Sequence, residues 1–178
     1  TGWAGLSERQ DIDKPLIAAV NGPAMGGGFE IALACDIVVA DEDAYFGLPE
    51  PRWNAVALGG GAQRLVARMP RAVAMGLMLT GRRMGAAEAE RWGVVNEVAS
   101  RGTALEVARR WADEVLTCAP LALRHTKKIA RDAWEGPAFT DQLAQRRKDV
   151  ADALFRSEDI NEGLAAFREK RKPVWRGR

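Results

Sequence analysis

The apolar positions of this chain change their spacing near residue 100. Before that point, short apolar runs are separated by glycine and proline, which is typical of alternating strands and helices. Beyond it, apolar residues recur at intervals of three and four, as they do in amphipathic helices. The pattern therefore predicts a mixed part over residues 1–100 and a helical part over residues 101–178.

The first part contains a predicted strand, helix and strand. Leu16–Val20 is a short apolar run that ends at the turn signal Asn21-Gly22-Pro23, and Ile37–Ala40 is a second apolar run. Between them, Gly27–Cys35 has no breaker after its first glycines, so we expect a helix that begins at those glycines. This order of elements indicates an α/β fold.

The remaining segments add short strands and several helices. Ala44–Gly47 is interpreted as one more strand, and Pro49–Pro51 as an extended loop, because the residue before a proline avoids the helical region. Val94–Val98 alternates weakly and predicts a last strand. The predicted helices cover residues 60–69, 71–80, 85–92, 104–116, 120–134, 138–156 and 159–170.

Composition and charge narrow the classes of function. The 178 residues are 47% hydrophobic, and 26 Lys+Arg nearly balance 24 Asp+Glu, for a formal net charge of +2. A chain so close to neutrality has no overall field that would favour nucleic acid or an anionic membrane. Its longest aliphatic run, Leu16–Val20, is far shorter than the roughly 20 apolar residues of a membrane span. We therefore expect no nucleic-acid partner and no membrane partner.

The cysteines and the single histidine form no motif for a metal or a nucleophile. Cys35 and Cys118 stand far apart in the sequence, which argues against a zinc site and against a disulfide framework. We expect no metal, and a reducing cytoplasm as the setting. His125 lies among basic residues, so a Ser/His/Asp or Cys/His site would lack its base, and we interpret this histidine as a surface residue.

Two glycine runs stand before predicted helices. Neither Gly26–Gly28 nor Gly59–Gly61 has the spacing of a phosphate-binding loop or of a dinucleotide fingerprint. A glycine run at a helix start instead presents unhindered backbone N–H groups at the positive end of the helix dipole. Such groups can stabilise an oxyanion, which makes Gly26 and Gly27 candidate binding residues.

Two glutamates are candidates for proton transfer. Glu30 lies in the first turn of the helix that follows the first glycine run, and Glu50 lies twenty residues later beside two prolines. Paired carboxylates can divide acid and base work when their environments separate their pKa values. The alternative interpretation also stands, because glutamates are common in first helical turns and in loops.

The segments that carry these residues resemble the core signature of the enoyl-CoA hydratase/isomerase family, also called the crotonase family. The resemblance implies a crotonase-like spiral of strand–strand–helix units, whose C-terminal portion is residues 1–100, and a helical oligomerisation region at 101–178. The matching segments are Ala19–Ile37, Ala44–Glu50, Gly59–Leu65, Leu79–Gly81, Ala86–Ala89 and Gly93–Val95.

The resemblance also implies roles for single residues. Gly27 matches the glycine whose N–H helps to hold the thioester oxygen, with Gly26 beside it, and Glu30 and Glu50 match the acid/base pair of the hydratases. Retention of both carboxylates favours hydration of a 2-enoyl-CoA, or the reverse dehydration. Coenzyme A enters as part of the substrate, no further cofactor is implied, and the expected assembly is a homotrimer or a hexamer.

A narrower similarity within the family points to carnitinyl-CoA dehydratases, which interconvert carnitinyl-CoA and crotonobetainyl-CoA. It is carried by Thr80–Asn96, Ser157–Asp159 and Phe167–Arg178. A trimethylammonium substrate would favour an aromatic face or a carboxylate. Trp53, three residues after Glu50, is a candidate for that contact, and core packing is the alternative interpretation of the same residue.

Members of this family normally carry an upstream segment with a second oxyanion donor, which is absent from the printed sequence. A fragment of a longer enzyme and a member without activity are both open on this basis. Two alternatives to hydration therefore remain: another crotonase-type reaction such as double-bond isomerisation, and a noncatalytic assembly subunit.

Overall fold

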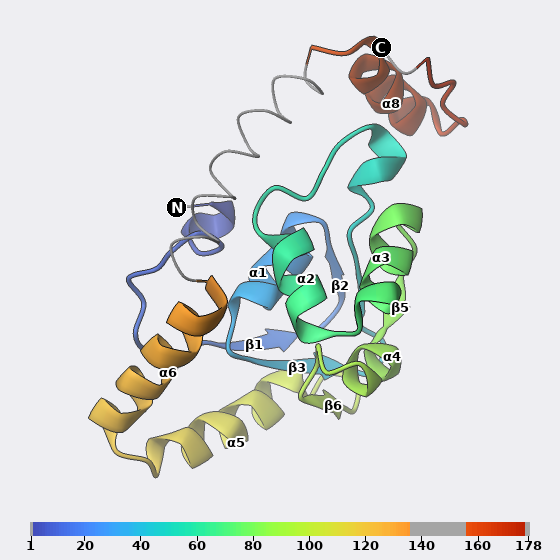
Figure 1. Ribbon diagram of the computed structural model, residues 1–178. Coiled ribbons are helices and arrows are strands. Elements are labelled where there is room, and N and C mark those ends of the chain that lie inside the picture. The colour runs from blue at the N-terminus through green and yellow to red at the C-terminus, as the bar shows by residue number, and fades with distance from the viewer. Residues whose placement is uncertain (1, 136–155, 177–178) are drawn as a thin grey trace.

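The computed structural model describes residues 2–135 and 156–176, and it contains two small sheets (Figure 1). The first sheet is parallel, with strand order β1-β3-β6, and the second has the order β2-β4-β5, in which β2 and β4 are parallel and β5 is antiparallel. The strands are β1 (Ile17–Val20), β2 (Pro23–Met25), β3 (Ile37–Asp41), β4 (Tyr45–Gly47), β5 (Met84–Gly85) and β6 (Glu97–Ala99).

Helices connect and cover these strands, and the predicted α/β fold is confirmed. The 3-10 turns are η1 (Trp3–Gly5) and η2 (Glu50–Trp53). The α-helices are α1 (Gly27–Ala34), α2 (Gly61–Arg68), α3 (Arg71–Thr80), α4 (Ala86–Arg91), α5 (Ala104–Leu116), α6 (Pro120–Glu135) and α8 (Glu158–Glu169). The helix predicted at 138–156 lies almost wholly outside the described residues. No helix in the described parts of the chain is long and apolar enough to cross a bilayer.

Both faces of the first sheet are covered by helices. Alternate residues of a strand point to opposite faces. Accordingly, Val38 belongs to the main core with α1 and α2, whereas the next residue, Val39, packs against Ala104 and Ala108 of α5. Figure 1 shows α5 on the opposite side of β1 and β3 from α1 and α2. Burial on both faces explains why β3, the central strand, begins with an apolar run that has no polar alternation.

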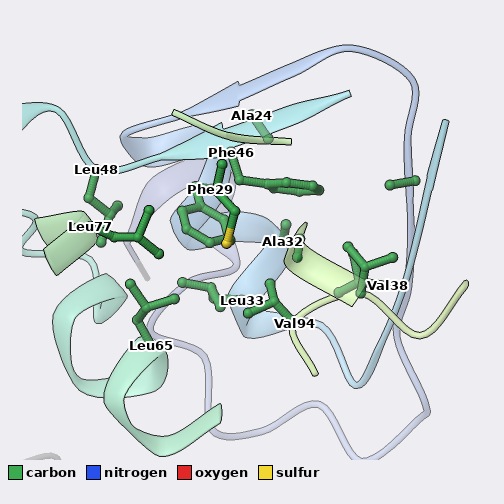
Figure 2. Close-up of a cluster of buried hydrophobic side chains, with 14 of the residues drawn as sticks. Ala24, Phe29, Ala32, Leu33, Val38, Phe46, Leu48, Leu65, Leu77 and Val94 are labelled. Atoms are coloured by element: carbon green, nitrogen blue, oxygen red, sulfur yellow. The ribbon is translucent and has the colours of Figure 1, made fainter. Parts of the chain in front are cut away.

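The main core lies beneath the start of α1. Phe29 of α1 and Phe46 of β4 are fully buried, with ring centroids 5.2 Å apart. Figure 2 shows these two rings side by side, with Leu33 and Leu65 also in the cluster. Since Phe29 immediately precedes Glu30, close packing of this ring holds the backbone that carries the candidate carboxylate.

Two predictions about the prolines were wrong. The extended loop expected at Pro49–Pro51 is the 3-10 turn η2, which Pro51 fits because the first N–H groups of a helical turn have no intrahelical acceptor to lose. Pro23, expected to lie in a turn, instead opens β2. It is accommodated there as the first residue of a strand that has one neighbour in its sheet.

The strand predicted at Val94–Val98 is displaced toward the C-terminus. The backbone N–H groups of Val94 and Val95 donate to the carbonyl of Ala89 at 2.9 and 3.2 Å and close the end of α4. Pairing with β3 therefore begins later, at Glu97. Weak alternation could not separate these two uses of the same apolar residues.

Candidate active site

Parallel pairing of β2 with β4 places the two candidate segments beside each other. Met25 is paired with Gly47 at the ends of the two strands, and the Gly26 N–H donates to the Gly47 carbonyl at 2.9 Å. Because the two strands are parallel, the chain leaves both of them at the same end of the sheet. One exit leads into α1, and the other leads through Leu48 into η2, which begins at Glu50.

The Glu50 carboxylate lies directly against the backbone of Gly26. A Cβ atom placed on Gly26 would stand 3.0 Å from Oε1 of Glu50. Gly26 also has a φ of 55°, a region that side chains of L-residues rarely adopt. Both the conformation and the close approach therefore require glycine at this position.

Helix α1 begins at Gly27 and directs its first N–H groups out of the helix. Its first intrahelical bond runs from the Glu30 N–H to the Gly26 carbonyl at 3.0 Å. The N–H groups ahead of Glu30, including that of Gly27, have no acceptor within the helix and carry the positive end of its dipole. The predicted helix start at these glycines is confirmed, but the Gly26 N–H is already taken up by the Gly47 carbonyl. The oxyanion and binding roles of Gly26 and Gly27 stay predictions.

Glu30 is enclosed by the second glycine run. Its side chain is 1% exposed, and Oε1 accepts a hydrogen bond from the Gly61 N–H at 2.9 Å. Cβ atoms on Gly59 and Gly61 would each stand 2.8 Å from Glu30 atoms, namely Oε2 and Cγ. Gly61 is the first residue of α2, so the carboxylate lies at the N-terminus of a second helix, where negative charge is stabilised.

Glu50 has a different environment. Its Oε2 atom is buried and has no hydrogen-bond partner among the described residues. Burial raises the pKa of Glu50, and the charge of Glu30 raises it further. The two carboxyl groups therefore differ in their surroundings: Glu30 accepts a backbone N–H at a helix start, and Glu50 is pushed toward its protonated form.

Trp53, the predicted aromatic contact, packs against the C-terminal helix. Its ring meets that of Phe167 on α8 edge to face, with centroids 5.2 Å apart. A hydrogen bond of 2.8 Å from Asn54 Nδ2 to Ser157 Oγ joins the same two elements. The packing interpretation accounts for these contacts, and a role of Trp53 in substrate binding stays a prediction.

Two features of the site were missed by sequence reasoning. The indole of Trp3 stands over the start of α1, with Cδ2 3.1 Å from a Cβ placed on Gly27, and it also contacts Gly59. Trp3 lies in an irregular turn without periodicity, so no local pattern could identify it. The run Gly59–Gly61 was noted as a glycine run but was not assigned to Glu30, because Gly61 is 31 positions beyond that glutamate in the sequence.

A separate cavity of about 660 Å³ lies between α6 and the α1–α2 pair. Its lining includes Leu33, Arg68 and Lys127 and does not include Glu30 or Glu50. The described residues contain no group of three or more His, Cys, Asp or Glu side chains that could hold a metal ion. The roles of the two carboxylates and of the backbone N–H groups in catalysis stay predictions.

The chain is similar to known proteins along nearly its whole length. The family model described as enoyl-CoA hydratase/isomerase matches residues 2–178. The carnitinyl-CoA dehydratase of Salmonella typhimurium strain LT2 is 47% identical over 179 residues, an alignment that covers 99% of this chain and 69% of that protein. The carnitinyl-CoA dehydratase of Escherichia coli O157:H7 is 46% identical over 180 residues, with the same coverage.

A solved structure shows the same fold. The crystal structure of a carnitinyl-CoA hydratase from Mycobacterium avium superimposes with a TM-score of 0.94 and 45% sequence identity. The superposition covers 99% of this chain and 68% of that one.

Proposed function

The chain belongs to the enoyl-CoA hydratase/isomerase family, and from that premise we propose that it interconverts carnitinyl-CoA and crotonobetainyl-CoA. It is a hydratase-type lyase of acyl-CoA thioesters with a crotonase fold. The narrower substrate is supported by the names of the relatives that match nearly the whole chain at 46–47% identity. No metal and no cofactor besides the coenzyme A of the substrate enter the proposed reaction.

The two glutamates divide the proposed hydration between them. Glu30, as the carboxylate, takes one proton from a water molecule whose oxygen forms a bond to C3 of the enoyl group. The C2–C3 double bond shifts its electron pair toward the thioester oxygen, where the Gly27 N–H meets the developing charge. Glu50, as the carboxylic acid, gives its proton to C2. Dehydration runs the same steps backward, and proton exchange with solvent restores both side chains.

The observation that carries this assignment is the contrast between the two carboxylates. Glu30 accepts the Gly61 N–H at the start of α2, whereas Glu50 has a buried Oε2 and a raised pKa. A carboxyl group with a raised pKa can serve as the acid at neutral pH, and the proposal gives the role of the base to Glu30.

The direct test is hydration of crotonobetainyl-CoA by the purified protein, with crotonyl-CoA as the substrate that lacks the trimethylammonium group. Loss of the enoyl thioester absorbance reports the rate, and mass spectrometry identifies the product. Faster hydration of crotonobetainyl-CoA supports the proposal. If only crotonyl-CoA is hydrated, the proposed reaction is supported but the proposed carnitinyl substrate is wrong. A product with a shifted double bond and no added water would indicate isomerisation.

The proposed assembly is a homotrimer or hexamer held by the helical part. Helices α5 and α6 carry large apolar side chains that are exposed in the single chain, among them Leu116, Leu121 and Ile129 at 78, 68 and 71%. Apolar surface of this kind is typical of contacts between copies. Sedimentation equilibrium tests the proposal, since a monomer at assay concentration would contradict it.

A further inference from the structure

We propose that Arg64 is a positioning residue for the acid/base pair, which it serves by holding the glycine turn that carries the donor to Glu30. The inference rests on the proposed hydration, because it concerns the same carboxylate. It adds a residue that acts on the carboxylate through the backbone of this turn. Its evidence is a chain of contacts from α2 to Glu30.

The guanidinium of Arg64 is packed inside the turn that precedes its own helix. Arg64 is 6% exposed, and its Nη1 donates to the Gly59 carbonyl at 3.2 Å. A Cβ atom on Gly60 would stand 2.6 Å from the same Nη1, and Gly60 has a φ of 94°. The cation therefore occupies the space that a side chain at Gly60 would need.

The same turn supplies the hydrogen bond to Glu30. Gly59, whose carbonyl Arg64 holds, also packs against Oε2 of Glu30, and Gly61, two residues later, donates its N–H to Oε1 at 2.9 Å. Three consecutive glycines have wide conformational freedom, so this segment does not fix its own shape. The contact from Arg64 restricts the turn at Gly59 and Gly60 and thereby holds the Gly61 donor in place.

A neighbouring arginine provides a matched control. Arg68 lies one turn later on α2 and also holds backbone carbonyls, those of Leu33 at 2.9 Å and Cys35 at 2.5 Å. Those carbonyls belong to the C-terminal end of α1, at the opposite end of that helix from Gly26 and Gly27. Loss of either arginine removes hydrogen bonds to backbone carbonyls, but the Arg64 contacts are the ones that lead to Glu30.

The experiment compares Arg64→Gln and Arg64→Lys with Arg68→Gln and Arg68→Lys in the full chain. Steady-state kcat and KM for enoyl-CoA hydration are measured beside Tm. We expect Arg64→Gln to lower kcat on the order of 100-fold with little change in KM, since a small displacement of a catalytic group has an effect of that size. Arg64→Lys keeps a cation that can donate to the Gly59 carbonyl, so this variant recovers part of the lost kcat. The Arg68 variants lower Tm and leave kcat of the folded protein unchanged.

The outcomes separate this inference from the proposed function. If the unsubstituted protein hydrates no enoyl-CoA, the proposed function fails and this inference fails with it. If it does hydrate them and the Arg64 variants keep their kcat, or lose no more kcat than the Arg68 variants, the inference alone is wrong. Should Arg64→Gln not fold, Arg64→Lys against Arg68→Lys decides the question: a lower kcat at equal Tm supports the positioning role, and equal kcat overturns it.

Discussion

Oε1 of Glu30 lies 2.9 Å from the backbone nitrogen of Gly61, so the first residue of α2 donates to a carboxylate in the first turn of α1. Two helix N-termini therefore meet at one buried glutamate. Glu50 has no hydrogen-bond partner for its buried Oε2 among the described residues, and burial raises its pKa. The asymmetry between the carboxylates leads to the following expectations.

Glu30→Gln and Glu50→Gln should each lower the hydration rate by about 10²–10⁴-fold, the usual contribution of a general acid or base. The glutamine amide oxygen at position 30 can still accept the Gly61 N–H, so the fold is retained and the change isolates the charge. Rates with crotonyl-CoA and crotonobetainyl-CoA, beside Tm for each variant, check the prediction. Full activity in either variant would remove that residue from the mechanism.

The raised pKa of Glu50 predicts a pH dependence of stability. The folded protein holds the Glu50 proton to a higher pH than the unfolded chain, so this group's contribution is complete below the unfolded pKa and is lost as pH rises through the folded pKa. Glu50→Gln removes the ionisable group. The variant should therefore gain stability relative to the parent at pH 8 and gain less at pH 4. Urea unfolding at both pH values measures the free energy of unfolding of the variant relative to the parent. The same difference at pH 8 and at pH 4 would contradict a raised pKa of Glu50.

The glycines of the first run should differ in their tolerance of a methyl group. Gly26→Ala places Cβ 3.0 Å from Oε1 of Glu50 and strains a residue with φ of 55°, so we expect a large loss of kcat. Gly28→Ala is the matched control, because nothing lies within 4 Å of its Cβ and alanine favours the helix by about 1 kcal/mol over glycine. Similar kinetics for both variants would refute the close approach of Glu50 to Gly26.

The tryptophans near the carboxylates should affect substrate preference unequally. Trp3 packs over Gly27 beside Glu30, whereas the Trp53 ring is engaged by Phe167. An aromatic face attracts a quaternary ammonium group by on the order of 1 kcal/mol, which is roughly fivefold in kcat/KM. Trp3→Leu should lower the preference for crotonobetainyl-CoA over crotonyl-CoA by about that factor, and Trp53→Leu should change it less. A larger loss of preference in Trp53→Leu than in Trp3→Leu would instead indicate that Trp53 contacts the trimethylammonium group.

Docking of α8 depends on a glycine at its contact with η2. A Cβ atom on Gly163 would stand 2.8 Å from the carbonyl oxygen of Trp53, so Gly163→Ala must displace the helix. We expect faster amide exchange in α8 and η2. Gly76→Ala in α3 is the control, because a Cβ there meets nothing within 4 Å. Unchanged exchange in the Gly163 variant would contradict the close approach.

The elements whose local signals agree were predicted well. Strand β1, helix α1 and strand β3 follow from apolar runs bounded by breakers, and the Gly26–Gly28 start of α1 follows from its glycines. The start of β6 at Glu97 was missed because Val94 and Val95 close α4. Hydrophobic periodicity does not show whether the backbone of these residues closes a helix or pairs with a strand. The division of the chain at residue 100 stays a prediction.

The sequence by itself determined the α/β class, the candidate glutamates and the glycine run beside them, because these depend on residue types and on spacing within short segments. The tertiary structure decided what surrounds each carboxylate. The register between β2 and β4 places Gly26 beside Glu50. Packing of α2 against α1 places Gly61 beside Glu30, with Arg64 on the same glycine turn. Contacts across 20 to 30 residues depend on strand pairing and helix packing. The difference between the surroundings of Glu50 and those of Glu30 is therefore a property of the folded chain.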